Sequence, residues 1–267
     1  MITLQGLAKQ RLHLSAKGSG ERVVITWSYR KRGLAWMMFL ATVLLWLSPV
    51  YGGGTILENF DNNIFNQQLF WLNNWGGASA TVANQHLEVT IPANDGIDFV
   101  VGGLGNQFKL VGNFDVQVDF DLPTWPAANG VNAGIITPSF QVTRNSHYEN
   151  GPIPGPVDTY LASFHPGQKF FWVNTSDKSG KLRLKRTGNT VEAFYGQNEA
   201  WQSIGSHTDP QLGAPVEYYI GAYSGGGAYG PTQTVSAFFD NYQIIYDNIV
   251  FGGNSNATAP ILLLLLQ

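Results

Sequence analysis

Short runs of alternating apolar and polar residues fill the chain between Thr55 and Phe251. The runs are rich in Val, Ile, Phe, Tyr and Trp, and Gly, Asn, Pro or Asp residues bound each of them. A period of two places successive side chains on opposite faces of a strand, and no long window has the helical period. The pattern predicts an all-β chain, a two-sheet antiparallel jelly-roll sandwich. The predicted strands are 55–60, 79–82, 86–91, 99–101, 113–122, 131–142, 159–164, 170–174, 181–186, 190–195, 201–205, 218–223, 235–239 and 242–251.

The composition agrees with this fold class. Only 12% of the residues are charged, and 31 are Gly, which argues against helical bundles, whose surfaces need charged helix formers. The chain has no Cys, which excludes disulfides, Cys-containing zinc sites, thiol catalysis and a lipidated N-terminal Cys. The apolar core must therefore stabilise the domain without covalent cross-links.

The first 52 residues have the pattern of an export signal. A basic segment, residues 1–32, precedes the uncharged apolar run Gly33–Val50, and small residues follow at positions 52–54. This order predicts a signal peptide cleaved after Gly52, with an uncleaved single-span anchor helix as the alternative. We therefore expect the sandwich to follow an N-terminal apolar signal or anchor helix and to be secreted, extracellular or periplasmic.

The charge of the remaining chain excludes one class of partner. Residues 1–52 hold seven of the fifteen basic residues and one of the eighteen acidic residues, so the remainder carries a formal charge of about −9. Nucleic-acid binding needs a cationic surface that neutralises phosphates, and this chain lacks one. We expect no nucleic-acid partner, and contact with a membrane only through an uncleaved N-terminal segment.

The C-terminal end, PILLLLLQ at residues 260–267, follows a Gly- and Asn-rich spacer. The apolar run is too short to span a bilayer. It is interpreted as a degenerate sorting signal, as a tail that docks on the domain, or as a disordered end. The predicted organisation is a signal or anchor at 1–52, the sandwich at 53–252, and the spacer with its tail at 253–267.

One hairpin is defined especially well. The run Lys181–Arg186 and the run Thr190–Tyr195 flank a Thr-Gly-Asn turn, with Leu182 and Leu184 facing the core. Lys181, Arg183 and Lys185 then form an outward basic stripe, to which Arg186 and Lys178 are added. The stripe is explained either by solvated charges that protect a sheet edge or by contact with an acidic polysaccharide.

Several segments resemble the concanavalin A-like lectin/glucanase superfamily. They are GNFDVQVDFDL, the long stretch GKLRLKRTGNTVEAFYGQNEAWQSIG and the closing VSAFFDNYQI, with the likeness strongest at Leu182–Gly188, Trp201 and Phe239–Asn241. The resemblance spans roughly Thr55 to Phe251 and implies a jelly roll whose concave sheet often holds glycans. It also implies that Trp201 is a core residue. Because the superfamily includes lectins, glucanases and other modules, the fold alone does not select a function.

The residues argue against catalysis. The laminarinase-type E-x-D-x-E strand is absent, and its nearest counterpart places Asp115, Asp119 and Asp121 on one face of a strand. We interpret this face as solvated, although a divergent glycoside-active site using Asp119, Asp121 or Glu149 stays open. No cofactor is required by the sequence. Calcium is the candidate, at Asp240 and Asn241, and the alternative is that Asp240 bonds neighbouring backbone N–H groups.

Aromatic side chains supply the candidate ligand site. Glycan sites use exposed aromatic rings beside polar groups that bond sugar hydroxyls. Trp71 and Trp75 are instead expected to cover a sheet edge. The candidate ligand-binding residues are Trp125, Tyr148, Tyr223, Tyr229, Arg144 and Trp172.

These observations favour an exported, non-catalytic module that binds carbohydrate or another cell-envelope ligand. The expected partner is a polysaccharide or cell-envelope glycan. The alternatives are a structural assembly protein of the surface and a divergent glycoside-active enzyme. Convergence of the aromatic candidates on one surface would favour binding, and scatter would favour a scaffold.

Overall fold

The computed structural model describes residues 50–93, 99–146, 157–225 and 230–251, all within one compact unit. The described residues form sixteen strands and one short 3-10 helix, η1 at Pro210–Gly213. The strands make two antiparallel sheets, so the all-β sandwich prediction is confirmed. Residues 1–49, with the predicted signal or anchor helix, and residues 252–267 lie outside the described residues. Within the described ranges, no helix is long and apolar enough to cross a membrane.

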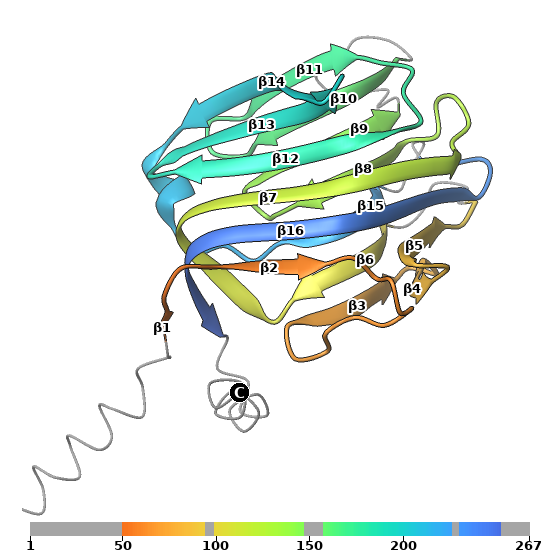
Figure 1. Cartoon of the computed structure of the whole chain (residues 1–267). Coiled ribbons are helices and arrows are strands. Elements are labelled where there is room, and N and C mark those ends of the chain that lie inside the picture. The colour runs from red at the N-terminus through yellow and green to blue at the C-terminus, as the bar shows by residue number, and fades with distance from the viewer. Residues whose placement is uncertain (1–49, 94–98, 147–156, 226–229, 252–267) are drawn as a thin grey trace, which may run out of the picture. The chain divides into compact units, whose positions relative to one another are not determined.

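The nine-stranded sheet is drawn in front in Figure 1. Its central strands are the two longest of the molecule, β7 and β16, which pair with each other over most of their length. The order is β14-β13-β12-β7-β16-β5-β4, and β1 and β2 also pair with β16. The bounds are β1 Val50–Tyr51, β2 Gly54–Glu58, β4 Ser79–Ala83, β5 His86–Ile91, β7 Phe108–Thr124, β12 Ser179–Thr187, β13 Thr190–Gln197, β14 Ala200–Thr208 and β16 Val235–Phe251.

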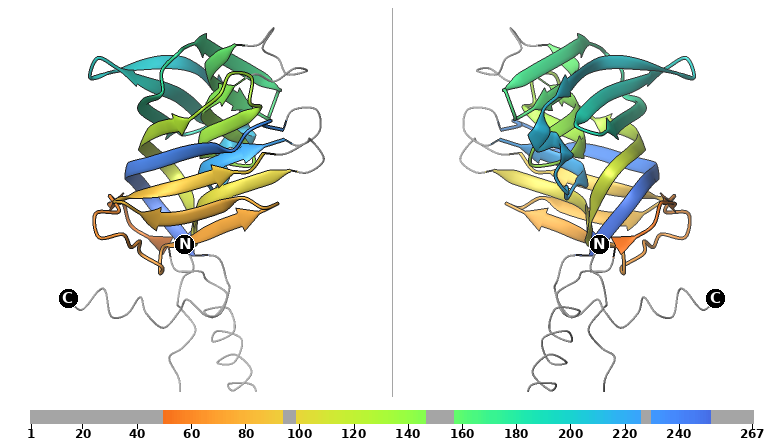
Figure 2. Two further views of the ribbon diagram at one scale, coloured as in Figure 1. Left: turned by 90° about the vertical axis from the view of Figure 1, so that its right-hand side faces the viewer. Right: turned by 90° about the vertical axis from the view of Figure 1, so that its left-hand side faces the viewer.

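The seven-stranded sheet forms the second layer, as the side views of Figure 2 show. Its order is β11-β10-β9-β8-β15-β6-β3, so the edge strands are β11 and β3. The bounds are β3 Phe70–Trp75, β6 Val100–Asn106, β8 Val131–Ile136, β9 Phe140–Ser146, β10 Asp158–Phe164, β11 Lys169–Asn174 and β15 Tyr219–Ser224.

The strand predictions hold with three differences. The predicted strand 131–142 is two strands, because the segment between β8 and β9 turns the chain back. The two predicted strands at 235–251 are one, β16, whose pairing with β7 is interrupted near Asn241, a residue with φ +50°. The edge strand β3 and the two-residue strand β1 were not predicted as strands.

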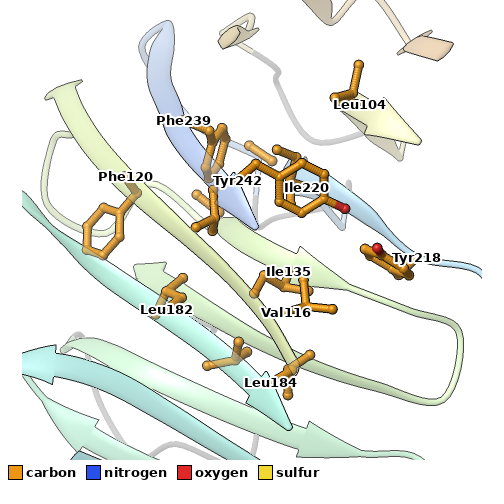
Figure 3. Packing of buried hydrophobic residues seen from close by; sticks show 14 of the residues in the cluster. Leu104, Val116, Phe120, Ile135, Leu182, Leu184, Tyr218, Ile220, Phe239 and Tyr242 are labelled. Carbon is orange, nitrogen blue, oxygen red and sulfur yellow. The ribbon is translucent and has the colours of Figure 1, made fainter. Parts of the chain in front are cut away.

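The core lies between the two sheets. Figure 3 shows side chains of both layers meeting there, among them Val116 and Leu184 of the nine-stranded sheet and Ile135 and Ile220 of the seven-stranded sheet. Each of these four side chains is at most 1% exposed. Burial of apolar surface at this density is the main stabilising term of a domain without cross-links.

The β12–β13 hairpin matches its prediction, with Leu182 and Leu184 buried and Gly188 in the turn at φ +58°. The explanation of the basic stripe as edge protection is wrong, because β12 is an inner strand. The stripe faces carboxylates of β7 instead: Arg183 makes a two-contact ion pair with Asp115, and Lys181 lies 3.3 Å from Asp119. The stripe is therefore largely neutralised by its own sheet.

The expected position of Trp201 is also wrong. It was expected in the core, but its half-buried ring lies on the outer side of the nine-stranded sheet, with its centroid 5.4 Å from the Arg183 guanidinium carbon. Phe194 lies at the same distance from that carbon. The guanidinium attracts both ring faces while it pairs with the β7 carboxylate, and this exposed-side arrangement replaces core packing.

The grouping of Arg186 with the outward basic stripe is wrong, because its side chain is buried and bonds backbone carbonyls inside the protein. Its side chain is 1% exposed and donates to four backbone carbonyls. Nε donates to Gly112 O at 2.6 Å, and Nη1 donates to Leu212 O at 3.0 Å and Ala214 O at 2.7 Å, while Nη2 donates to Leu110 O at 3.4 Å. Burial lowers the pKa of Arg186 to about 10, and the charge of Asp247 acts in the opposite direction.

Candidate functional site

The site begins with the alternation of side chains in the seven-stranded sheet. Residues of one parity, such as Leu104, Ala133 and Ile220, belong to the core cluster. Residues of the other parity point away from the core, which is why Val101 and Ile136 are buried but absent from that cluster. We call this second side of the seven-stranded sheet the outer face.

The strand registers arrange the outer face in three rows that cross all seven strands from β11 to β3. The central row is Trp172, Leu161, Thr143, Gly134, Gly221, Gly103 and Asn73. One flanking row is Asn174, Thr159, Asn145, Asn132, Tyr223, Val101 and Trp75. The other is Phe170, Ser163, Gln141, Ile136, Tyr219, Gly105 and Trp71.

Glycine occupies the centre of the central row for steric reasons. A Cβ added to Gly103 would lie 2.3 Å from Ile220 O, and one added to Gly221 would lie 2.2 Å from Gly102 O. A Cβ at Gly134 would lie 2.3 Å from Val142 O. These distances are shorter than any van der Waals contact, so the middle of the row carries no side chains and forms the low part of the outer face.

Exposed indole rings stand at both edges of this face. On β3, Trp75 is 64% exposed and Trp71 is 46% exposed, and on β11 at the opposite edge Trp172 is 39% exposed. A Cβ at Gly105 would lie 2.6 Å from Trp71 Cε2, so the indole lies over the bare glycine backbone. Large exposed aromatic rings on a rigid sheet are the groups that pack against the C–H faces of sugars.

The floor between these edges is polar, uncharged and incompletely bonded. Asn145 Nδ2 donates to Asn132 Oδ1 at 2.8 Å. Asn145 Oδ1, Thr159 Oγ1 and Ser163 Oγ are buried and have no hydrogen-bond partner in the described part of the structure. These three oxygens lie beneath the accessible surface, so they add polar character to the floor and do not contact solvent directly.

Tyr223 joins the polar floor to an apolar neighbour. Its hydroxyl accepts from Gln141 Nε2 at 3.0 Å and lies 3.1 Å from Gln141 Oε1, on the far side of Gly134. Its ring is 5.7 Å from the ring of Phe99, which is 47% exposed. Burial, followed by the Tyr223 hydroxyl, raises the pKa of Tyr219 on the same face, so the Tyr219 phenol stays a neutral hydrogen-bonding group.

The rows on these seven strands contain no Asp, Glu, Lys, Arg or His. Glycoside hydrolysis requires two carboxyl groups on either side of the scissile bond. The carboxylates of the predicted strand face, Asp115 and Asp119, lie on the other sheet and pair with Arg183 and Lys181. Glu149 lies outside the described residues.

Two of the predicted ligand-binding residues are buried. Trp125 is 6% exposed and belongs to the core cluster, so the expectation of an exposed ring is wrong. Arg144 is 0% exposed, and its guanidinium carbon lies 5.9 Å from the ring centroids of both Trp125 and Tyr160. Its donors reach Asp158 Oδ2 at 2.9 Å and backbone carbonyls, so it cannot contact a ligand directly.

The remaining aromatic candidates divide into two groups. Trp172 and Tyr223 both lie on the outer face, where β3 adds Trp71 and Trp75. Tyr148 and Tyr229 lie outside the described residues. The sequence interpretation missed the β3 pair as ligand groups, although Trp71, Asn73 and Trp75 already have the period of two that predicts a shared face.

The candidate calcium residues lie at the irregularity of β16. Asp240 Oδ1 accepts from Asn241 N at 2.7 Å, and Asn241 Nδ2 donates to Asp119 Oδ2 at 3.1 Å. Burial raises the pKa of Asp240, with a smaller contribution in the same direction from Asp119. The described ranges contain no group of three or more His, Asp or Glu side chains placed to hold a metal ion.

Comparison with known proteins identifies the fold. The sequence matches no protein-family model and no curated protein. A lectin from Bauhinia forficata in complex with GalNAc has a similar structure, with a TM-score of 0.51 at 11% identity over 75% of this chain and 100% of the lectin. A β-1,3-glucanase from Mycobacterium marinum aligns with a TM-score of 0.51 at 10% identity over 71% of this chain and 97% of the glucanase.

A GH43 protein from Bacillus licheniformis also aligns, with a TM-score of 0.50 at 15% identity over 71% of this chain. This chain spans 39% of the length of that protein. Likeness at such identities concerns the fold. The protein has the two-sheet jelly-roll fold of these lectin and glucanase structures, which is the fold that the sequence resemblance implied.

Proposed function

We propose that this protein is a non-catalytic module that binds neutral carbohydrate across the outer face of the seven-stranded sheet. The observation that carries the proposal is the outer face itself: exposed indoles at both edges and an uncharged floor with unpartnered buried oxygens. Indole rings pack on sugar C–H faces, and amide and hydroxyl groups bond sugar hydroxyls. The similar structures include a lectin in complex with GalNAc and a β-1,3-glucanase, and this likeness supports a glycan partner in general.

The absence of ionised side chains from these rows supports a non-catalytic role and a neutral ligand. Without a carboxylate pair on the rows, the face lacks the acid and base that glycoside hydrolysis needs. Without a cation it lacks the partner that an acidic polysaccharide requires, and burying uronate groups against an uncharged floor would be costly. Neutral glycans are therefore the expected ligands.

Affinity electrophoresis of the full chain tests this proposal. Gels would contain a neutral polysaccharide, such as laminarin or mannan, or an acidic one, such as alginate, and released reducing ends would be assayed in parallel. We expect retardation by a neutral polymer without release of reducing ends. Trp71→Ala and Trp172→Ala should each reduce retardation, whereas Leu57→Ala, which removes an exposed apolar side chain from the nine-stranded sheet, should not.

Retardation by alginate alone would contradict the proposal, as would release of reducing ends by the wild-type protein or equal effects of all three variants. Binding to none of the polysaccharides would favour the assembly role instead.

We also propose that residues 1–52 direct export, with the sandwich at 53–252 as the working domain. Cleavage after Gly52 would remove β1, whose two residues pair with Val250 and Ile249 of β16. N-terminal sequencing of protein recovered outside the cytoplasm tests this point. A start at Gly53 supports cleavage, and an intact N-terminus would contradict it.

A further inference from the structure

A second site lies at the end of the sandwich where β10, β11 and β13 meet. It is a pocket of about 580 Å³ that opens between the two sheets. The residues that matter for its chemistry are Asp158, Tyr160, Asn174, Asp177, Tyr195 and Gln197. Asn174 is the only one of these six residues that also belongs to an outer-face row. The proposed function does not use the other five.

Two stacked tyrosine rings, Tyr160 and Tyr195, form the aromatic wall of the pocket. The ring of Tyr160 stacks on the ring of Tyr195, with centroids 4.5 Å apart and planes at 16°. Tyr160 is 1% exposed, and its other side faces the buried Arg144. Tyr195 is half-buried, so the wall presents a supported aromatic surface rather than a mobile side chain.

One carboxylate in the lining of the pocket has no ion-pair partner among the described residues. Arg144 Nη2 pairs with Asp158 Oδ2 at 2.9 Å, and Lys178 Nζ donates to Trp125 O at 2.9 Å. Asp177 Oδ2 accepts from the Tyr160 hydroxyl at 2.8 Å, and no cationic side chain of the described residues pairs with this carboxylate. Asp158 is therefore paired and Asp177 is not, so the Asp177 carboxylate is the charge of the pocket lining that lacks an ion-pair partner among the described residues.

The phenol of Tyr160 remains a donor under ordinary conditions. Burial, together with the hydrogen bond to Asp177, raises its pKa well above the usual value. Its proton therefore orients the Asp177 carboxylate and leaves the second carboxylate oxygen for another donor. That donor must come from solvent or from a ligand.

We propose that this pocket binds an organic ammonium group, such as the amine of a hexosamine. An ammonium group makes charge-assisted hydrogen bonds to the Asp177 carboxylate, and its carbon skeleton packs on the aromatic wall. The volume falls within the range of small-molecule sites. A bare metal ion is disfavoured, because calcium needs six to eight oxygen ligands and the described residues contain no acidic group of three.

Titration calorimetry of the full chain tests the proposal with three sugars that share one ring and differ at C2. D-glucosamine carries the ammonium group at mildly acidic pH, whereas D-glucose and N-acetyl-D-glucosamine are neutral. We expect glucosamine to bind about tenfold or more tightly than either neutral sugar, with an affinity that falls as salt is added. Calcium is titrated as a separate probe.

Asp177→Asn is the informative variant. The Asn carbonyl still accepts from the Tyr160 hydroxyl, so the fold is retained while the charge is lost, and glucosamine should bind about tenfold more weakly. Glu217→Gln is the matched control. It removes the same charge from an exposed ion pair with Lys109, at the opposite end of β7 from the Tyr160 contact with Phe120, and should bind like the wild type.

Four results would each overturn the proposal. They are equal binding of glucosamine and glucose, unchanged binding of glucosamine in Asp177→Asn, binding of calcium alone, and binding of none of the probes. Trp71→Ala separates the two sites. It should reduce retardation by neutral polysaccharide and leave glucosamine binding unchanged, so failure of one proposal is distinguishable from failure of the other.

Discussion

The Tyr223 hydroxyl bonds the side-chain amide of Gln141 although 82 residues separate them in the chain. The two side chains come from β15 and β9, and β8 lies between those strands. Between them β8 contributes Gly134, whose backbone packs so closely on β9 that an added Cβ would lie 2.3 Å from Val142 O. The polar centre of the outer face therefore depends on a residue that makes no side-chain contact of its own.

Gly134→Ala should destabilise the protein. An added Cβ would lie 2.3 Å from Val142 O and 2.8 Å from Leu182 Cδ1, so backbone must move. Overpacking of this kind costs about 1–3 kcal/mol of unfolding free energy, which urea denaturation would measure. Gly52→Ala is the control, because nothing lies within 4 Å of its added Cβ, and an equal loss in both variants would contradict the interpretation.

Arg186→Met should be among the most destabilising single changes. The side chain keeps much of its volume, but four backbone carbonyls lose a charged donor inside the protein. We expect a loss of about 3–5 kcal/mol in the free energy of unfolding. Lys185→Met, the exposed neighbour on β12, should change stability by less than about 0.5 kcal/mol. Similar denaturation midpoints for the two variants would refute the buried-donor argument.

Arg183 and Asp115 should be coupled energetically. Their two-contact ion pair joins β12 to β7, and both side chains are more than three quarters buried. A double-mutant cycle with Arg183→Met and Asp115→Asn should give a coupling of about 1 kcal/mol that decreases in high salt. Additive effects of the two substitutions would show that the pair contributes nothing to stability.

Asp240→Asn should stabilise the protein at neutral pH and not at low pH. Burial raises the pKa of Asp240 in the folded state, so folding disfavours the ionised carboxylate. This penalty is present above the folded-state pKa and disappears as the pH falls below the ordinary carboxyl value of about 4. Urea midpoints of wild type and variant should thus differ at neutral pH and converge in acid. A lower midpoint of the variant at neutral pH would contradict the sign.

The effect of removing an edge indole on glycan binding should depend on the length of the glycan. If a glycan crosses the outer face, a long polymer contacts both Trp172 on β11 and Trp75 on β3, whereas a disaccharide reaches one edge. Trp75→Ala and Trp172→Ala should each weaken binding of the polymer. Only one of them should affect a disaccharide, as measured by titration calorimetry. Equal effects of both variants on the disaccharide would show that the edges do not act as separate contacts.

The sequence by itself determined the local structure. The period of two and the Gly- and Asn-containing turns predicted most strands, and the β12–β13 hairpin was predicted with its inward Leu182 and Leu184. Local signals suffice here because side-chain alternation and turn geometry depend on neighbours within a few residues.

Only the tertiary structure decided which residues share a surface. Trp172 and Trp75 lie at opposite edges of one face because five strands, from distant parts of the chain, pair between theirs in specific registers. Trp125 and Arg144 were predicted to contact a ligand, but both are buried and lie close to each other inside the protein. Strand order, register and burial arise from contacts between residues far apart in the chain, and local patterns do not encode them.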